Sequence, residues 1–519
     1  MGATRTLFVR QELSQTMSET DPQTAYDRLH ERAERVGGLE TIDNLLFWDQ
    51  QVMMPAGGTP GRSMQRGLVS SLQHEALVGD DVAGWLDAVA EADLDEDQQA
   101  VVREVRRDHE RKAAVPRELE ERRNGVISEA NAAWEEAREN DEWETFAPYL
   151  EELVELTRTQ AEHIDPNAEP FDVILGEYEP YLDVENVEAV FEDLKETLVP
   201  LIDDIRASDA DPGGVFEANG PYDEETQMAL SEDALSFVGC DWDRARLDTS
   251  PHPFSYGNRH DMRITTRFHK ASIIGGLSSS LHEYGHASYE HGLDEAAFPD
   301  PLGQSRSHGI HESQSRFWEN HVGRTEAFWV EFLPEVQSQF SQLSAVTPRE
   351  AYEAANRVNE ENFIRVEADE VTYHLHVLIR FEIERDLVNG DLDVEDVPQV
   401  WNDKYEDYLG IRPETDSDGC LQDIHWSIGR IGSFQGYTLG TVFAAQLTNA
   451  LEEDLGESVE SLVADRRFDD LREWMGEHVH LHGKRYPTDE LVEVATGEPL
   501  TAEYFLDYVT EKYEALYEL

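Results

Sequence analysis

Long segments with helical periodicity are the feature that most constrains the fold of this chain. Residues 23–40 and 95–165 are rich in Glu, Arg, Ala and Leu, and their apolar residues recur every three to four positions. That spacing places the apolar side chains on one face of a helix. The segment 121–140 carries one such stripe, made of Val126, Ala130, Ala133 and Trp134. Residues 378–390 end on Asn-Gly, a normal helix stop. We therefore expect helices over most of the chain.

Evidence for strands is thin. Residues 260–269, HDMRITTRFH, alternate and include β-branched side chains, so they are the best strand candidate. The chain of 519 residues can bury a large core. We predict a mainly α fold with a small β-sheet, in which residues 17–519 form one domain with two lobes around a groove. Met17 opens a segment typical of a protein start, so we expect residues 1–16 to be a disordered extension or a wrongly assigned start.

The net charge is the most unusual feature of the composition. The chain has 110 Asp and Glu against 42 Lys and Arg, which gives a net charge of −68. Such a field repels nucleic acid and anionic membranes, so we expect neither as a partner. The acids are spread along the chain, and an acidic tail does not explain them. In molar salt the Debye length is only about 3 Å, which screens their repulsion. We interpret the chain as a halophile's protein from a salt-rich cytoplasm.

Cysteine content and hydropathy exclude further classes of protein. Cys240 and Cys420 cannot form a disulfide framework or a cysteine-based zinc site, and we expect buried or inert thiols. No run of about 20 apolar residues exists, so no membrane span is predicted. The apolar stretch near the first residue is too short for a signal peptide. We expect a cytoplasmic protein.

Residues 281–292, LHEYGHASYEHG, have the spacing of a metal site. On a helix, His282 and His286 lie on the same face, and Glu283 lies beside the first. This is the HExxH arrangement, in which two imidazoles hold zinc and the glutamate serves the zinc-bound water. The alternative is a solvated polar face in a chain with many glutamates. A zinc enzyme also needs a third protein ligand and one open position.

Three candidates exist for the third ligand. One type of HExxH site uses a histidine six residues after the second, but that position is Gly292, and His291 is one residue off. The second candidate is Glu312 on a predicted helix over residues 308–323, far enough along the chain to return antiparallel. The third is His308, one helical turn before Glu312. We favour Glu312.

The remaining polar residues of this predicted helix receive lesser roles. We expect His308 and His311 to support the ligands or the core, and Glu319 and His321 to be ordinary residues of the helix surface. Two histidines and one glutamate leave a fourth position for water, whose pKa zinc lowers from about 15.7 to about 7. Glu283 then acts as the general base and later delivers the proton to the leaving amine. The predicted reaction is metal-assisted hydrolysis, most simply of a peptide bond.

Further motifs make the chain resemble a known family. They are HPF at 252–254, DMRIT at 261–265, HES at 311–313, IRVEAD at 364–369 and GCLQDIHW at 419–426, in addition to HEYGH. Together with LLFWDQQVMMPAGGTPGR at 45–62, they occur in the order of the thermostable metallocarboxypeptidase family, the carboxypeptidase Taq type. The resemblance covers residues 20–519, and six ordered motifs are specific where one would not be.

The resemblance implies a large helical, zincin-like metallopeptidase with a long substrate groove, usually a homodimer. It implies removal of C-terminal residues one at a time, with broad specificity, from peptides with a free C-terminal carboxylate. Zinc is the expected metal, with cobalt or another divalent ion as the alternative. Carried over by motif, His282, His286 and Glu312 are the metal ligands and Glu283 is the catalytic base.

An enzyme that acts at a C-terminus must recognise a carboxylate, and a planar guanidinium does this best. Arg365 of IRVEAD is our first choice for this role, and the alternative is a structural pair with Asp369. Arg263 of DMRIT is a weaker substrate-binding candidate. The strand around Arg263 could instead run beside an extended peptide and add backbone hydrogen bonds.

The oxyanion of the transition state needs a donor besides the metal. His425 of QDIHW is the main candidate, with Asp423 or Gln422 fixing its geometry, and the alternative is a buried structural histidine. Tyr437 and Tyr408 are further donor candidates. We expect His252 of HPF to order a loop at the groove.

The chain departs from the family pattern after QDIHW. Residues 427–440 read SIGRIGSFQGYTLG, with Ser433 where an aromatic residue is common and Gln435 where proline is common. This departure bears on the shape of the subsites and on substrate preference, while the metal chemistry is untouched.

Two rival functions fit part of the sequence. An oligoendopeptidase or dipeptidyl carboxypeptidase of a related helical fold also has HEYGHA, but IRVEAD and GCLQDIHW favour the carboxypeptidase. A non-enzymatic helical scaffold with a structural metal is the other rival, and it has no need of Glu283.

Overall fold

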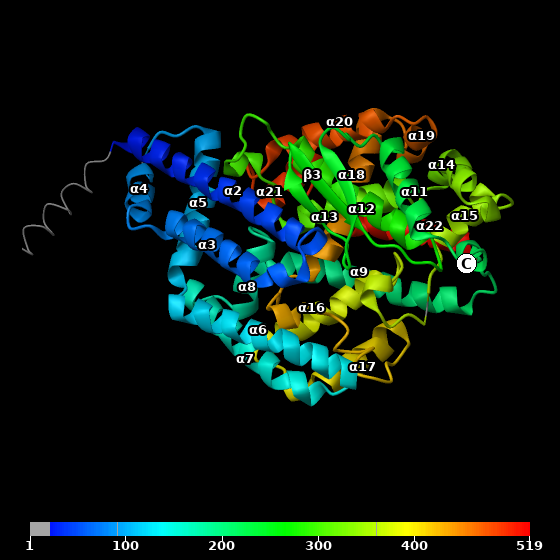
Figure 1. Cartoon of the computed structure of the whole chain (residues 1–519), viewed down its shortest axis with the longest axis horizontal. Helices are drawn as coiled ribbons and strands as arrows, with labels where there is room; N and C mark the ends of the chain where they lie inside the picture. Colours follow the sequence, from blue (N-terminus) through cyan, green and yellow to red (C-terminus); the bar gives the residue numbers. More distant parts are fainter. Residues whose placement is uncertain (1–20, 91, 360) are drawn as a thin grey trace, which may run out of the picture.

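The computed structural model describes residues 21–90, 92–359 and 361–519, and the predicted extension 1–16 lies outside them. The fold is mainly helical with one small sheet, as predicted (Figure 1). The α-helices are α2 (Pro22–Val52), α3 (Thr59–Val78), α4 (Val82–Val89), α5 (Glu96–Ala114), α6 (Arg117–Asn140), α7 (Trp143–Ile164), α8 (Pro170–Tyr178), α9 (Val184–Ala207), α10 (Val215–Ala218), α11 (Glu224–Phe237), α12 (Ile274–Gly292), α13 (His308–Arg316), α14 (Glu326–Gln339), α15 (Pro348–Ala355), α16 (Tyr373–Asn389), α17 (Val397–Leu409), α18 (Gln435–Leu455), α19 (Val459–Ala464), α20 (Phe468–His478), α21 (Thr488–Thr496) and α22 (Glu503–Tyr517).

Short helical turns connect these elements. Those that matter for the site are the π-helix η3 (Phe317–Val322) and the 3₁₀ helices η5 (Arg365–Glu367) and η7 (Trp426–Ile428). The other 3₁₀ helices are η1 (Ala56–Gly58), η2 (Pro301–Gly303), η4 (Ser341–Leu343), η6 (Val394–Asp396) and η8 (His480–His482). No helix in the described part of the chain is long and apolar enough to cross a membrane.

The predicted helix signals hold at the level of single residues. All four members of the α6 stripe, Val126, Ala130, Ala133 and Trp134, are buried. α16 ends at Asn389, and Gly390 follows with a φ of 89°, a left-handed conformation that glycine adopts without steric cost. The apolar periodicity therefore identified the faces that pack inward.

The small sheet contains β1 (Ala245–Thr249), β2 (Ser255–Asn258) and β3 (Asp261–Thr266), in the order β1-β3-β2. β1 runs parallel to β3, with Ala245 opposite Met262, and β2 runs antiparallel to β3, with Ser255 opposite Ile264. β3 confirms the predicted strand, but it is the central strand. Its neighbours already occupy both of its edges, so an extended peptide cannot add to β3, and that expectation is corrected.

Two large apolar clusters form the core, and α18 contributes to both. One cluster is built mainly from α6 to α9, α16, α17 and α22. The other is built from the sheet, α11 to α15 and α18 to α21. In Figure 1 the sheet, α12, α13 and α18 lie in the upper part, and α6, α7, α16 and α17 lie below. A smaller cluster joins α2, α4 and α5. The division into two lobes around one groove stays a prediction.

Glycines allow three helices to meet at the centre of the fold. A Cβ atom on Gly285 of α12 would lie 2.3 Å from the carbonyl oxygen of Gln314 on α13. A Cβ atom on Gly440 of α18 would lie 2.5 Å from the Cβ of Glu312. Both distances are shorter than van der Waals contact, so only glycine permits the observed approach. The predicted metal residues sit where these helices touch.

Candidate metal centre and substrate site

Neighbouring helices α12 and α13 bring three potential ligands together. His282 and His286 project from α12 one turn apart, and Glu312 projects from the middle of α13. The Nε2 atoms of His282 and His286 lie 3.8 and 3.4 Å from Oε2 of Glu312. One ligand atom from each residue lies within 4.8 Å of the others. The sequence therefore identified three residues that converge on one point.

The carboxylate of Glu319, in the π-helix η3 that follows α13, orients His282. Nδ1 of His282 lies 2.9 Å from Oε2 of Glu319, which leaves Nε2 directed at Glu312. Glu319 also accepts hydrogen bonds from Arg316 at 3.1 Å and Arg324 at 3.0 Å. Burial alone would raise the pKa of Glu319, but Arg316 and His282 outweigh burial and hold the pKa well below its ordinary value. A carboxylate behind a metal-binding imidazole fixes its tautomer and raises its basicity.

A second set of hydrogen bonds, through His311 and Glu290, orients His286. Nδ1 of His286 lies 3.1 Å from the carbonyl oxygen of His311 and 2.6 Å from Nδ1 of the His311 ring. Nε2 of His311 lies in turn 3.1 Å from Oε1 of Glu290. Burial and the neighbouring His311 lower the pKa of His286 to about 3, so its imidazole is neutral at physiological pH. A neutral imidazole with its Nδ1 engaged offers Nε2 as a ligand.

Arg316 holds one carboxylate oxygen of Glu312, and the other oxygen faces the two histidines. Nε of Arg316 donates to Oε1 of Glu312 at 2.8 Å, and Oε2 faces the histidines. Burial opposes ionisation of Glu312, but Arg316 and His282 outweigh it and hold the pKa well below its ordinary range. The guanidinium of Arg316 also lies over the ring of Tyr373, 4.7 Å from its centre. Glu312 is thus held to present one oxygen.

Glu283 is the unpaired carboxylate beside this cluster. Its side chain is buried, and within the described residues it forms neither a hydrogen bond nor an ion pair. Burial raises the pKa of Glu283 to about 7, and the nearby His282 opposes the rise. A carboxylate with a pKa near neutrality can both take up and release a proton.

The donor set fits a divalent transition metal. Two imidazole nitrogens and one carboxylate oxygen are the ligands of catalytic zinc sites, which keep a fourth position for water or substrate. Each imidazole has its Nδ1 engaged by the protein, so both Nε2 atoms are available. The three donors therefore suit zinc or a similar ion.

Arg365 is held by a partner that differs from the one considered in the sequence. Its Nη2 donates to Oδ1 of Asp423 at 2.8 Å, and its Nη1 donates to the hydroxyl of Tyr373 at 3.0 Å. Asp369 instead caps the backbone of Val371 and Thr372. Arg365 is only 5% exposed. Nε of Arg365 also donates to Asp423. A guanidinium carries five N–H donors, so these three contacts leave two donors of Arg365 unused.

His425 and Tyr437 lie together. Nε2 of His425 is 3.4 Å from the hydroxyl of Tyr437, and Nδ1 of His425 is 3.8 Å from Asp423. Tyr437 also packs edge-on against His308, with ring centres 4.7 Å apart. Its ring lies 5.4 Å from the guanidinium carbon of Arg365. Two predicted donors and the predicted carboxylate-binding arginine thus form one cluster.

The side chains of two predicted substrate residues, Tyr408 and Arg263, are engaged by other partners. Tyr408 donates to Glu382 at 2.8 Å and lies under Lys195, in a group that contains none of the candidate site residues. Arg263 makes paired contacts with Asp261 and lies 4.1 Å from the ring centre of Trp48.

His252 lies in the exposed loop between β1 and β2. Its carbonyl accepts a hydrogen bond of 2.6 Å from the Ser250 hydroxyl, which agrees with a role in ordering that loop.

The departures at Ser433 and Gln435 are fully buried at the start of α18. Both side chains are buried, so neither can contact a bound peptide directly. The Ser433 hydroxyl donates to the Arg430 carbonyl at 3.4 Å.

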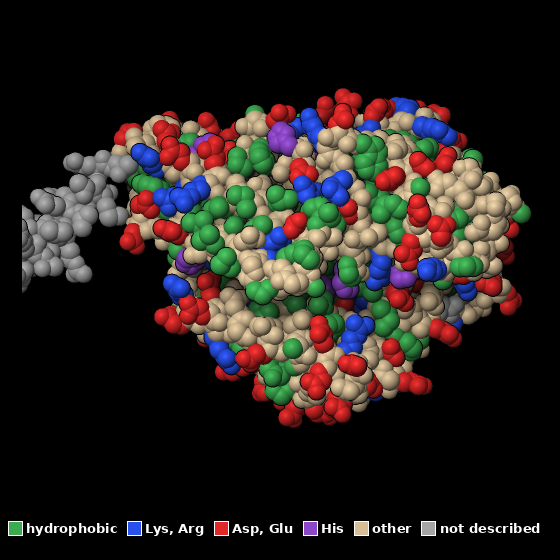
Figure 2. Space-filling view, in the orientation of Figure 1, with side chains coloured by type: hydrophobic (Ala, Val, Ile, Leu, Met, Phe, Trp, Pro, Cys, Tyr) green, Lys and Arg blue, Asp and Glu red, His purple; other side chains and the backbone are tan. Residues whose placement is uncertain are grey.

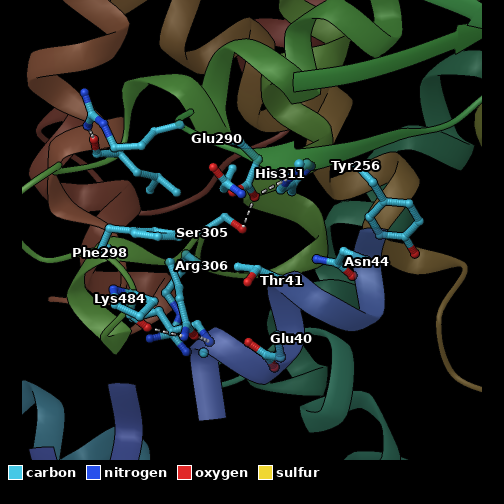
Figure 3. Close-up of a pocket in the computed structure, with 18 of the residues that line it drawn as sticks. Glu40, Thr41, Asn44, Tyr256, Glu290, Phe298, Ser305, Arg306, His311 and Lys484 are labelled. Atoms are coloured by element: carbon cyan, nitrogen blue, oxygen red, sulfur yellow. Dashed lines mark hydrogen bonds and ion pairs between the residues drawn. The ribbon is translucent and has the colours of Figure 1, made fainter. Parts of the chain in front are cut away.

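A cavity of about 460 Å³ opens beside the metal residues. Its walls come from α2, β2 and the segment before α13, and His308 and His311 line it. Figure 3 shows Glu290 and His311 above Thr41 and Glu40 of α2, with Ser305 bonded to Glu290. Figure 2 shows the hollowed face between the upper and lower halves of the molecule. The cavity gives the site room for part of a peptide.

Several supporting residues were missed from the sequence. Glu319 and His321 were expected on the helix surface, but both are buried, at 7% and 5% exposure. Arg316 and Glu290 were not singled out at all. The spacing of 312, 316 and 319 places these residues on one helix face, which is the signal that could have found them.

A mainly helical fold in which His282, His286 and Glu312 converge on one point is typical of a helical metallopeptidase. The match to the family model described as carboxypeptidase Taq (M32) metallopeptidase spans residues 28–513. Thermostable carboxypeptidase 1 of Thermus thermophilus is 38% identical over 510 residues, covering 96% of this chain and 99% of the relative. Carboxypeptidase 1 of Bacillus subtilis is 37% identical over 481 residues, covering 91% and 95%.

Similarity to solved structures supports the same family. The M32 carboxypeptidase from Deinococcus radiodurans R1 has a TM-score of 0.91 at 38% identity, covering 96% of this chain and 100% of the other. The chain belongs to the carboxypeptidase Taq (M32) metallopeptidase family and is a metallocarboxypeptidase. The carboxypeptidase assignment is confirmed over the endopeptidase and scaffold alternatives.

Proposed function

We propose that this carboxypeptidase is zinc-dependent and releases C-terminal amino acids one at a time from peptides, with Glu283 as general base. The observation that carries the proposal is the convergence of Nε2 of His282, Nε2 of His286 and Oε2 of Glu312, beside an unpaired, buried Glu283. A bound zinc ion would polarise the scissile carbonyl and lower the pKa of a water molecule. Glu283 takes the proton of that water and passes it to the leaving amine.

The neighbouring cluster supplies substrate contacts. We propose that Arg365 directs its two remaining N–H donors at the terminal carboxylate. Its tight pairing with Asp423 holds the guanidinium in one orientation. Tyr437 and His425 are positioned to donate hydrogen bonds to the oxygen that gains charge in the transition state. Arg263, His252 and Tyr408 have partners that favour structural roles.

The direct test is the variant Glu283→Gln. We expect it to bind one equivalent of zinc while kcat/KM on a peptide ladder falls by about 10²–10⁴-fold, because only the proton transfer is lost. Metal content and product ladders are read by mass spectrometry, with and without a chelator. A Glu283→Gln variant that keeps full activity would exclude the mechanism. Wild-type hydrolysis of C-terminally amidated peptides would exclude the exopeptidase specificity.

We also propose a homodimer. Apolar side chains are exposed on α2 and α3, including Ile42, Leu45, Met64 and Leu68, and Figure 2 shows apolar surface over these helices. Exposed apolar patches of this kind mark interaction surfaces. Light scattering should give twice the mass of 59.1 kDa, and the double variant Met64→Asp, Leu68→Asp should give a monomer. A wild-type monomer would exclude the dimer.

We further propose that the protein works in a salt-rich cytoplasm. Figure 2 shows acidic side chains scattered over the visible face, in keeping with the net charge of −68. Dense surface acids repel one another in dilute buffer, and molar salt removes that repulsion.

A further inference from the structure

Arg430 stands out among the arginines of this acidic protein. Within residues 21–90, 92–359 and 361–519, the arginine side chains that form neither a hydrogen bond nor an ion pair are Arg35, Arg138 and Arg430. Arg35 and Arg138 are exposed, and Arg138 lies over the ring of Trp134. Arg430 is half-buried. In a chain with 110 acidic residues, a partly desolvated arginine without a carboxylate partner needs an explanation.

The backbone holds Arg430 beside the candidate catalytic residues. Arg430 lies in the loop between η7 and α18, flanked by Gly429 and Gly432, whose φ angles are 72° and 80°. The backbone N–H of Arg430 donates to the carbonyl of His425 at 2.9 Å. Its guanidinium carbon lies 6.0 Å from the ring centre of Tyr178. The loop that presents His425 therefore also presents Arg430.

The charge of Arg430 acts on both sides of the site. Burial raises the pKa of Tyr437, and Arg430 is the strongest charge that opposes the rise. Burial likewise raises the pKa of Tyr256 in the cavity wall, and Arg430 is again the strongest opposing charge. The backbone hydrogen bond to His425 thus holds Arg430 next to the His425–Tyr437 pair, and its charge also reaches Tyr256 in the cavity wall.

We propose that Arg430 receives a carboxylate group of the peptide substrate. This inference rests on the proposed carboxypeptidase mechanism and adds a specificity-determining residue to it. A guanidinium binds carboxylates through paired N–H donors, and a half-buried site strengthens that contact. No carboxylate of the described residues pairs with Arg430, so a substrate carboxylate is the partner that we expect.

Two substrate groups carry this chemistry: the side chain of Asp or Glu, and the terminal carboxylate. Arg365 retains donors for the terminal carboxylate, so an acidic side chain is the expected occupant of Arg430. The enzyme should then prefer acidic peptides. This preference would matter where peptides come from proteins as acidic as this one.

The test compares peptides that differ by one charge. N-acetylated tripeptides carry Glu or Gln at the last, middle or first position, and kcat/KM is measured for wild type, Arg430→Gln and Arg430→Lys in molar salt. Arg35→Gln is the matched control, since it removes an exposed, unpaired arginine from α2. Thermal melting and zinc content verify that each variant is folded and loaded.

We expect wild type to favour Glu over Gln at one position by about 10–100-fold, the range for a charged hydrogen-bonded contact. Arg430→Gln should remove this preference through KM, Arg430→Lys should keep part of it, and Arg35→Gln should keep all of it. If Arg430 binds the terminal carboxylate instead, Arg430→Gln should slow every peptide by a similar factor.

The proposal is overturned if wild type shows no preference and Arg430→Gln stays within twofold of it on every peptide. If Arg430→Gln fails to fold, Arg430→Lys and the wild-type Glu-to-Gln ratio decide: a ratio near one, with Arg430→Lys equal to wild type, overturns it. Failure of the mechanism itself is distinguishable, because wild type would then resist a chelator or cleave amidated peptides.

Discussion

The candidate site is supported by a chain of charged side chains, in which both carboxylates are buried. Glu312, Arg316, Glu319 and Arg324 follow one another with hydrogen bonds of 2.8 to 3.1 Å, and each carboxylate faces at least one guanidinium. The convergence of His282 and His286 could be predicted from the sequence, because helix geometry places residues with HExxH spacing on one face. The residues behind them were missed, because an acid-rich chain gives no compositional reason to single out Glu319. The spacing of 312, 316 and 319 was the available signal, and the π-helix at 317–322 alters the helical register on which that signal depends.

The variant Glu319→Gln tests this support. We expect zinc affinity to fall by about 10–100-fold, because Gln keeps a hydrogen bond to His282 but loses the charge that makes the imidazole basic. Competition with a fluorescent chelator gives the affinity, and circular dichroism verifies the fold. Glu335→Gln, at an exposed position on α14, is the control. Equal affinities for Glu319→Gln and wild type would contradict the role.

A buried carboxyl group behind α13 should make stability depend on pH. Glu179 accepts a hydrogen bond of 2.6 Å from the Gly309 N–H, and burial raises its pKa to about 7, opposed by Ser307 and Gly309. Since the unfolded pKa is near 4.5, the folded state binds the proton more tightly. This contribution is therefore complete below about pH 4.5 and is lost as the pH rises through 7.

Glu179→Gln removes that titration. Between pH 4.5 and pH 8, the free energy of unfolding of the variant should rise by about 3 kcal/mol relative to that of wild type, because folding raises the pKa of Glu179 from 4.5 to about 7. Denaturant unfolding at fixed molar salt measures the difference. A difference that stays constant over this range would show that Glu179 is ionised throughout.

At the scale of elements, the decisive contact is the close approach of α12, α13 and α18. Sequence periodicity identified the helical segments at 23–40 and 95–165, but it could not show that β3 is central or that Gly285 and Gly440 sit at helix crossings. Those facts depend on which elements meet in space. The HExxH motif fixes only His282, Glu283 and His286, whereas Gly285 inside it has a packing role.

Gly285→Ala should damage the site without touching a ligand. Its Cβ would lie 2.3 Å from the backbone of Gln314, so α12 and α13 must separate and carry Glu312 away from the histidines. We expect a loss of about 1–3 kcal/mol in unfolding free energy, together with weaker zinc binding. Gly125→Ala on α6 has open space around it and should instead stabilise by up to about 1 kcal/mol. Unchanged zinc binding in Gly285→Ala would refute the packing argument.

At the scale of the whole molecule, the net charge of −68 is the dominant feature. The described ion pairs include many on the surface, yet 110 acids cannot be balanced by 42 bases. Composition predicts this excess fully, because net charge does not depend on the fold. Composition could not place Arg430, since its lack of a partner is visible only in three dimensions.

We expect the midpoint of thermal unfolding and kcat/KM to rise together as NaCl is increased from 0.1 M towards the molar range, because screening weakens repulsion among surface acids. Differential scanning fluorimetry and a peptide assay at matched salt check both. A neutral, non-charged osmolyte is the control, since it should not reproduce the gain in full. Highest activity in low salt with the fold intact would exclude adaptation to salt.

The hydrogen bonds that orient His282 and His286 have a consequence for how the enzyme acquires its metal. Glu319 and the His311–Glu290 pair aim both imidazoles through bonds within the chain. We therefore expect an ion to bind without a refolding step and to exchange under mild dialysis. The metal recovered with a preparation would accordingly reflect which ions the growth medium and buffers provided.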